Sequence, residues 1–114
     1  MEFMAKEMKN GITLLQLRGR MDIMGVNAVE TKFSGYCAGE RPKVLVDLSG
    51  VDFLASIGIR LLVTNAKSMQ SRKGKMVLLN PMPDVMGELE MTDIPAIIPV
   101  YSQLESAEAV LLGH

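Results

Sequence analysis

This 114-residue chain has few aromatic residues, a single cysteine and almost no net charge. Tryptophan is absent and aromatic residues make up 4% of the chain, which disfavours a platform for stacking the bases of single-stranded nucleic acid. The 12 basic and 13 acidic residues leave a net charge of −1, so no overall field attracts nucleic acid. We therefore expect protein or small-molecule partners.

The lone cysteine, Cys37, excludes an internal disulfide and fits a reducing compartment. We expect it to be a packed thiol in a helix, because the single histidine, His114, lies at the end of the chain. No apolar run approaches the roughly 18 residues of a membrane span. The segment Met1 to Lys6 lacks the charged-then-apolar order of a signal peptide. These features predict a cytoplasmic protein that does not insert into a membrane.

The sequence also lacks the patterns of common enzymes. No Gly-rich loop ends in Gly-Lys-Ser/Thr, no His or Cys pair has metal-ligand spacing, and no serine can be matched to a histidine base. We expect no enzymatic activity, no cofactor and no metal. Ten methionines are typical of plastic core filling and permit self-association without requiring it, so we expect a monomer or weak dimer.

The apolar patterns that are present predict one α/β domain over residues 1–114. Asn10-Gly11 predicts a type I′ hairpin turn, because that turn needs positive φ at both central residues. Continuous apolar runs predict buried parallel strands, and Pro95 and Pro99 predict an edge or strand-end position for the last one. We expect strands at about 2–8, 12–17, 44–48, 76–79 and 94–100, and helices at about 25–36, 56–72, 81–91 and from 102 or 106 onward.

Glycines mark the expected breaks between these elements. Gly19 predicts a turn after the second strand, and Ser49-Gly50 predicts a turn that closes the third. Gly74 is expected as the C′ residue of the helix that starts near residue 56. The result is an α/β fold with a mixed sheet of four or five strands, an N-terminal hairpin and about four helices.

Ser56 lies where an apolar strand region gives way to an amphipathic helix. Its position predicts the N-cap, where a hydroxyl accepts from a free backbone N–H. A helix N-terminus is also electropositive and suited to holding a phosphate. Two interpretations therefore stand side by side, a capping serine and a phosphorylation switch. No capping box supports the first, because Ile59 stands where Glu or Gln would be expected.

The helix after Ser56 is expected to have a buried face and a partner-binding face. Apolar residues at helical spacing predict the buried face: Ile59, Leu62, Val63, Ala66 and Met69. Ile57 and Leu61 point roughly to the other side and, with Thr64, predict a small protein-contact patch. Arg60 and Lys67 on its flank fit either an acidic partner surface or a basic surface exposed to solvent.

Three further residues near the strand ends are candidates for a role. Gly58, in the first helical turn, predicts a close approach to the Asp22 segment or to a partner, since glycine there costs up to about 1 kcal/mol. Asp22 and Asp47 are general acids by residue type. Aspartates at strand ends more often accept from loop N–H groups, and that is our interpretation of Asp47.

Residues 44–62, Val-Leu-Val-Asp-Leu-Ser-Gly-Val-Asp-Phe-Leu-Ala-Ser-Ile-Gly-Ile-Arg-Leu-Leu, resemble the signature of STAS domains. Anti-sigma factor antagonists and the tails of sulphate transporters share that fold. Weaker matches extend the resemblance from about Met4 to Leu111: Gly19 to Asp22, Lys73 to Lys75, and Ser102 to Ala107.

The resemblance implies that Ser56 is the phosphoacceptor and that Gly58 is the glycine of the family pattern. Two positions depart from that pattern. Ala55 stands where the family has an aspartate, and Ile57 stands where it has a small residue. In this family the loop after the second strand lies beside the phosphorylatable serine, which makes Asp22 a candidate for partner binding.

The resemblance further implies an anti-sigma factor antagonist in a partner-switching circuit. Its partners would be a histidine-kinase-like ATPase, which is both the anti-sigma factor and the serine kinase, and a metal-dependent serine phosphatase. Ala55 and Ile57 also motivate two alternatives. One is an unphosphorylated STAS accessory subunit of a transporter, such as a lipid-transport ATPase complex, and the other is a STAS signalling module with a non-sigma output.

Overall fold

The computed structural model describes residues 1–113, so His114 lies outside the described part. It contains one mixed sheet with the strand order β1-β2-β3-β4-β5, in which β1 and β2 are antiparallel and the other neighbours parallel. The elements in chain order are β1 (Glu2–Glu7), β2 (Thr13–Met21), α1 (Ile23–Tyr36), β3 (Lys43–Leu54), α2 (Ser56–Ser71), β4 (Lys75–Leu79), α3 (Pro83–Met91), the 3₁₀ helix η1 (Ile94–Ala96), β5 (Val100–Tyr101) and α4 (Leu104–Leu111). The predicted α/β fold with an N-terminal hairpin is confirmed.

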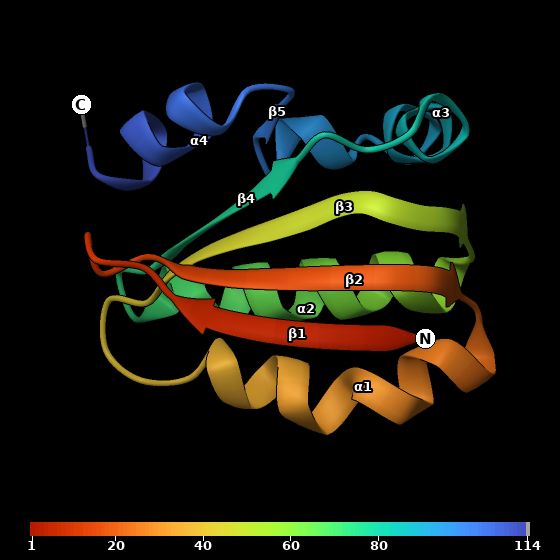
Figure 1. Ribbon diagram of the computed structural model, residues 1–114, viewed down its shortest axis with the longest axis horizontal. Coiled ribbons are helices and arrows are strands. Elements are labelled where there is room, and N and C mark those ends of the chain that lie inside the picture. Colours follow the sequence, from red (N-terminus) through yellow and green to blue (C-terminus); the bar gives the residue numbers. More distant parts are fainter. Residues whose placement is uncertain (114) are drawn as a thin grey trace.

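Helices cover the two faces of the sheet unequally (Figure 1). Helices α1 and α2 lie together on one face, where Phe33, Leu62 and Met69 are fully buried against strand residues. On the other face, α4 packs Ala107 and Leu111 over a smaller cluster that includes Val77. Along β4, Met76 and Leu78 belong to the first cluster and Val77 and Leu79 to the second, because successive residues of a strand point to opposite faces.

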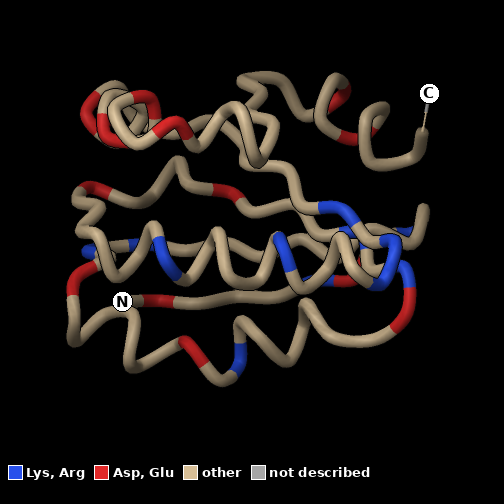
Figure 2. The backbone as a smooth tube through the Cα atoms, turned by 180° about the vertical axis from the view of Figure 1, so that it is seen from behind, with Lys and Arg blue, Asp and Glu red and all other residues tan. Residues whose placement is uncertain are grey.

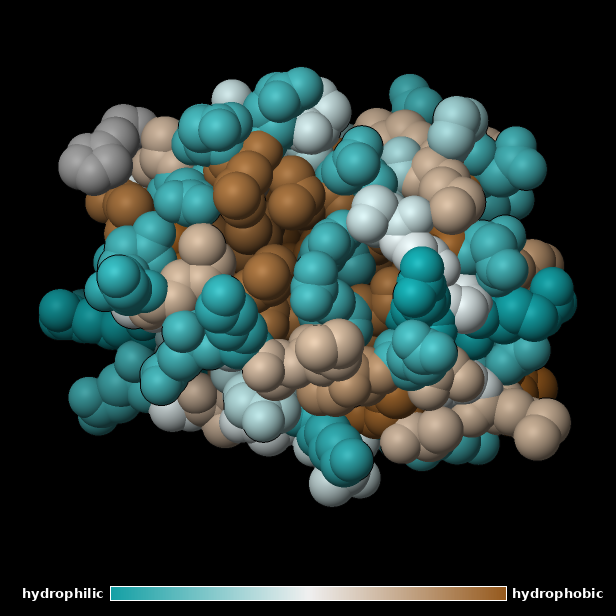
Figure 3. Space-filling model, in the orientation of Figure 1, coloured by the Kyte–Doolittle hydropathy of each residue, from teal (hydrophilic) through white to brown (hydrophobic). Residues whose placement is uncertain are grey.

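Much of the face opposite α1 and α2 is left without a helix over β1 and β2. Met4 is 66% exposed there, and Gln16 and Arg18 are also exposed. Figure 3 looks onto this face and shows hydrophobic atoms gathered beside α4, with polar and moderately hydrophobic side chains interspersed over the rest. This open face therefore exposes both polar and apolar side chains.

The N-terminal hairpin forms as predicted but with another turn. Gly11 has a φ of +85°, whereas Asn10 has negative φ, so the predicted type I′ turn is wrong. The Gly11 N–H donates to the Met8 carbonyl at 3.1 Å, and the Asn10 side-chain oxygen accepts from the Ile12 N–H at 3.2 Å. A longer loop with one left-handed residue therefore satisfies the backbone groups that a two-residue turn would have paired.

Strands β2 and β3 are longer than the sequence indicated. Gly19, with a φ of +113°, lies inside β2, and Ser49-Gly50 lies inside β3, so both predicted turns are wrong. The pairing of these strands shifts register twice, and each shift gives β3 one extra residue relative to β2. These β-bulges absorb the residues that looked like turns and carry both strands on to the Ser56 end of the sheet.

The C-terminus of α2 has a Schellman motif. The Lys73 N–H donates to the Gln70 carbonyl at 3.0 Å, and the Gly74 N–H donates to the Met69 carbonyl at 2.8 Å. Lys73 takes the left-handed conformation, with a φ of +62°, so the prediction of Gly74 as the C′ residue is wrong by one position. Gly74 is required for another reason, because a Cβ there would lie 2.4 Å from Cδ of Pro42.

The predicted fifth strand, residues 94–100, begins as a 3₁₀ helix and is a strand only at its end. Residues Ile94–Ala96 form η1, and only Val100 and Tyr101 pair with β4, at the edge of the sheet as expected. The predicted last helix is α4, which begins at Leu104. Pro95 and Pro99 each remove a backbone donor, so this segment cannot form a long ladder.

Candidate functional site

Ser56 is the first residue of α2 and is exposed. The N-cap is Ala55, with extended φ and ψ of −92° and 169°, so the prediction of Ser56 as the N-cap is wrong by one residue. Ala55 has no side chain that could cap the helix. Within residues 1–113, the Ser56 hydroxyl forms no hydrogen bond, so it is available to a partner.

The backbone at the start of α2 leaves two N–H groups open. Ala55 donates to the Met21 carbonyl at 3.0 Å, while Gly58 and Ile59 donate to the Ala55 carbonyl at 2.9 and 3.2 Å. The N–H groups of Ser56 and Ile57 have no acceptor in the described part of the chain. Free N–H groups and the helix dipole together favour a negative charge at this position.

Gly58 brings α2 close to the end of the sheet. Met21 and Leu54 are register partners at the ends of β2 and β3. A Cβ on Gly58 would lie 2.8 Å from Cδ1 of Leu54 and 3.0 Å from Cβ of Met21. The predicted close approach to the segment before Asp22 is therefore confirmed. Gly58 is buried, so it affects the site by letting α2 pack close to the strand ends and not by contacting a partner.

Asp22 caps α1 beside this junction. Its Oδ1 accepts from the Gly25 N–H at 2.8 Å, and its Oδ2 accepts from Nε of Arg20 at 3.3 Å. The pKa of Asp22 is lowered below its ordinary value of 3.8, mainly by the hydrogen bond from Gly25 and further by the Arg20 side chain. Partial burial acts in the opposite direction and raises this pKa. The Arg20 guanidinium also lies 4.1 Å over the Phe53 ring. Asp22, proposed from the family resemblance as a contact residue, thus holds a fixed, half-exposed carboxylate next to the start of α2.

Four of the predicted partner-binding residues line one hollow between α1 and α2. It has a volume of about 290 Å³ and is lined by Ile57, Arg60, Leu61 and Thr64, together with Glu30, Ser34 and Asn65. The structure therefore brings together most of the predicted patch. Charged groups of both signs and short hydroxyl side chains give this hollow a mixed, polar rim.

Leu61 is only 4% exposed, so the prediction that it points away from the core is wrong. The buried side of α2 is centred on Leu61, Leu62, Asn65, Ala66 and Met69, whereas Ile59 and Val63 are only partly buried. The sequence analysis placed the buried face one residue position around the helix from the observed one, because it did not expect the polar Asn65 to be buried. Leu61 forms the floor of the hollow, and Ile57, Arg60 and Thr64 form its accessible wall.

Three exposed apolar residues near Ser56 were missed by the sequence analysis. Ile23 is 65% exposed, Met24 83% and Phe53 40%. They lie at the same end of the sheet, because β2 and β3 end side by side before α1 and α2 begin (Figure 1). The signal was present, since two large apolar residues directly follow the capping Asp22, but the helix was expected to begin only at Gly25.

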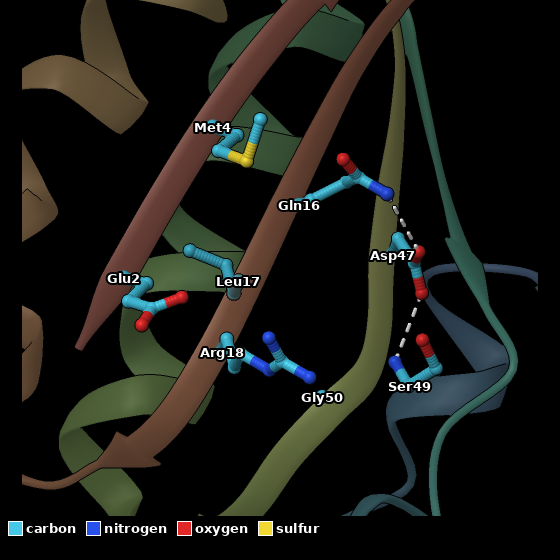
Figure 4. A pocket seen from close by; sticks show the side chains of 8 residues that line it. All are labelled: Glu2, Met4, Gln16, Leu17, Arg18, Asp47, Ser49 and Gly50. Carbon is cyan, nitrogen blue, oxygen red and sulfur yellow. Dashed lines mark hydrogen bonds between the residues drawn. The ribbon is translucent and has the colours of Figure 1, made fainter.

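Asp47 lies on the open face of the sheet, away from α1 and α2. Its Oδ1 accepts from the Ser49 N–H at 2.9 Å, and its Oδ2 accepts from Nε2 of Gln16 at 3.3 Å. Figure 4 shows both bonds at the rim of a hollow that Arg18 also lines. The predicted role of Asp47, accepting from a backbone N–H, is confirmed, although the residue lies within β3 and not at its end.

Cys37 is buried at the C-cap of α1, and burial raises the pKa of its thiol to about 12. The prediction of a packed thiol is therefore confirmed.

Within residues 1–113, no group of three His, Cys, Asp or Glu side chains could hold a metal ion. No helix in that part of the chain is long and apolar enough to cross a membrane.

Comparison with known proteins adds three findings. The sequence model of the STAS domain family matches residues 3–107. BtrV of Bordetella bronchiseptica, provisionally named an anti-sigma factor antagonist, is 25% identical over 100 residues, which cover 88% of this chain and 86% of BtrV. RsfB of Mycobacterium tuberculosis, an anti-sigma-F factor antagonist, is 34% identical over 65 residues, which cover 56% of this chain and 53% of RsfB.

The fold also matches solved structures. The structure of an anti-sigma-factor antagonist (STAS) domain protein from Planctomyces limnophilus has a TM-score of 0.86 to this chain, at 25% identity, and covers 96% of both chains. The α/β architecture and its strand order are therefore those of a known protein family.

Proposed function

Because this chain belongs to the STAS domain family, we propose that it is an anti-sigma factor antagonist switched by phosphorylation of Ser56. The relatives named above support the general role. One observation carries the switch: the Ser56 hydroxyl is exposed and unbonded at the electropositive start of α2. The proposed partner is an anti-sigma factor that is also a serine kinase, with a metal-dependent phosphatase resetting the switch.

The unphosphorylated protein would bind through the surface around Ser56. Exposed Ile23, Met24 and Phe53 supply apolar area, and the hollow between α1 and α2 supplies polar contacts. Interfaces commonly combine an apolar centre with a polar rim. Arg60 and Thr64 lie on this rim, and Asp22 lies beside the serine.

Phosphorylation would change the binding free energy without changing the fold. A phosphoserine adds about −1.5 to −2 charges near neutral pH. In the free protein, the open N–H groups of Ser56 and Ile57 and the helix dipole accommodate this charge, contributing up to about 1 kcal/mol. In a closed interface the same charge is desolvated or meets like charge, which costs several kcal/mol. A hundredfold loss of affinity corresponds to about 2.7 kcal/mol and lies well within that range.

Ala55 bears on how the kinase engages the serine. With no carboxylate at this position, a fixed aspartate at the same end of the sheet is Asp22, which follows Met21, the backbone partner of Ala55, and is held by Gly25 and Arg20. We propose that Asp22 supplies the negative charge beside the acceptor that Ala55 cannot. Asp22→Asn would keep an oxygen to cap α1 and remove the charge, so it separates the two roles.

The test is phosphorylation by the candidate cognate kinase with ATP, followed by intact-mass and peptide mass spectrometry. We expect one phosphate at Ser56, absent in Ser56→Ala and retained in Ser49→Ala, which removes an exposed serine from the open face. Ser56→Asp should bind the kinase about a hundredfold more weakly, with little change in stability. Tight binding without phosphorylation would contradict the switch and favour a constitutive STAS adaptor, such as a transporter accessory subunit.

A further inference from the structure

Basic residues are confined to the first two thirds of this chain. All 12 Lys and Arg residues lie in residues 1–75, whereas residues 76–113 carry six carboxylates and no Lys or Arg. Figure 2 marks these residues along the backbone: the α3 and α4 segments carry Asp and Glu positions and no Lys or Arg positions, and the Lys and Arg positions lie on the other elements. Although the net charge of the whole chain is only −1, the side of the protein formed by α3 and α4 is therefore acidic.

A hollow of about 430 Å³ lies where this acidic layer meets the end of β3. Its lining includes the carboxylates Asp52, Asp84 and Glu88 and the apolar side chains Phe53, Val85 and Met91. We call it the α3 hollow. Met91 is 82% exposed and Phe53 is 40% exposed, so a large apolar surface is left in water beside three negative charges.

We propose that the α3 hollow binds a basic amphipathic segment of a partner protein, in which Lys or Arg residues flank an apolar side chain. The apolar side chain would contact Met91 and Val85, since flexible methionine adapts to different shapes. The cations would pair with Asp84 and Glu88, which stand one helical turn apart on α3. Nucleic acids and anionic membrane surfaces are disfavoured here, because they carry the same sign of charge.

The α3 hollow lies next to the Ser56 surface and shares Phe53 with it. It shares no lining residue with the hollow between α1 and α2. Arg20 touches its edge through the Phe53 ring, but Asp22 already pairs with that guanidinium. The residues proposed to make the contacts, Asp84, Glu88 and Met91, lie on α3 and outside the Ser56 surface. Binding at the α3 hollow therefore does not require phosphate on Ser56, and the proposal stands even if Ser56 is never phosphorylated.

The experiment measures binding of a fluorescent synthetic helix with lysines on one face and leucines on the other, compared with a copy that has glutamate for lysine. We expect only the lysine peptide to bind, and more weakly as salt is raised, because exposed charges are screened. The double variant Asp84→Asn/Glu88→Gln should weaken binding by about tenfold. The matched control Glu90→Gln/Glu105→Gln, which removes two exposed carboxylates outside the hollow, should change it much less.

A second pair of variants tests the apolar contact. Met91→Gln should also weaken binding, whereas Met24→Gln, which changes an equally exposed methionine on the Ser56 surface, should not. If each variant and its matched control lost the same peptide affinity, binding would be nonspecific and the proposal would be overturned. Failure of the lysine peptide to bind at low salt would also overturn it. Self-association in sedimentation, lost in Met91→Gln, would assign the hollow to a second copy of this chain instead.

Discussion

Replacing Gly58 with alanine tests how tightly the Ser56 site is built. Elsewhere in a helix the change from glycine to alanine stabilises a protein by about 0.5–1 kcal/mol. At Gly58 the new methyl group would lie 2.8 Å from Cδ1 of Leu54, 3.0 Å from Cβ of Met21 and 3.2 Å from the Met21 carbonyl oxygen. The Leu54 side chain can rotate away, but the Met21 backbone is fixed by its pairing with Leu54 in the sheet.

Overpacking of this kind costs about 1–3 kcal/mol, which exceeds the gain in helix propensity. We therefore expect Gly58→Ala to lower the free energy of unfolding by about 1 kcal/mol, measured by urea denaturation with an unchanged m-value. Gly87, within α3, is the matched control, because a Cβ there meets nothing within 4 Å. Gly87→Ala should raise the free energy of unfolding by about 0.5–1 kcal/mol.

The two variants should thus change stability in opposite directions. If Gly58→Ala were as stabilising as Gly87→Ala, the close contact between α2 and the end of β2 would not constrain the site, and the argument would fail. The same contact has a functional consequence. Because relief of the clash requires α2 to move away from Met21, Gly58→Ala should also weaken binding of the anti-sigma factor.

Three further predictions follow from individual contacts. Lys73→Gly should raise the free energy of unfolding by about 1 kcal/mol in urea denaturation, because Lys73 is strained at a φ of +62°. Cys37 should resist alkylation by iodoacetamide at pH 8 and react once the protein is unfolded in urea, since burial raises its pKa to about 12. Asp22→Ala should lower the melting temperature at pH 7. The difference from the wild type should be largest above about pH 4 and shrink as the pH falls through the lowered pKa of Asp22, because protonation removes the negative charge that strengthens the cap and pairs with Arg20. An unchanged difference at pH 2 would refute the ionic part of that cap.

The order and type of most elements could be predicted from the sequence, because hydrophobic spacing reports which face of an element is buried. Local turn signals were less informative. Ser49-Gly50 and Gly19 look like turns, but the pairing of β2 with β3 makes them bulges inside long strands. Gly50 fits there because a Cβ would lie 3.2 Å from the Leu17 carbonyl oxygen, a contact with a strand distant in sequence.

The candidate site was predictable in its location and less so in its detail. The motif identified Ser56 and Gly58, and the structure brings Ile57, Arg60 and Thr64 together in one hollow. A shift of one residue in the helix start changed Ser56 from the N-cap to the first helical residue. The acidic α3 hollow could not be predicted, because Asp52 and Glu88 meet only through the packing of α3 against β3.

The strand order of the sheet, which follows the order of the strands in the chain, also describes how the domain can be synthesised. Each strand pairs with the strand made just before it, so no strand has to insert between two partners that are already joined. A chain leaving the ribosome can form the β1–β2 hairpin and then add β3, β4 and β5 in turn. The acidic α3 and α4 are made last, and they complete a sheet whose β1–β3 half, with α1 and α2, has already emerged.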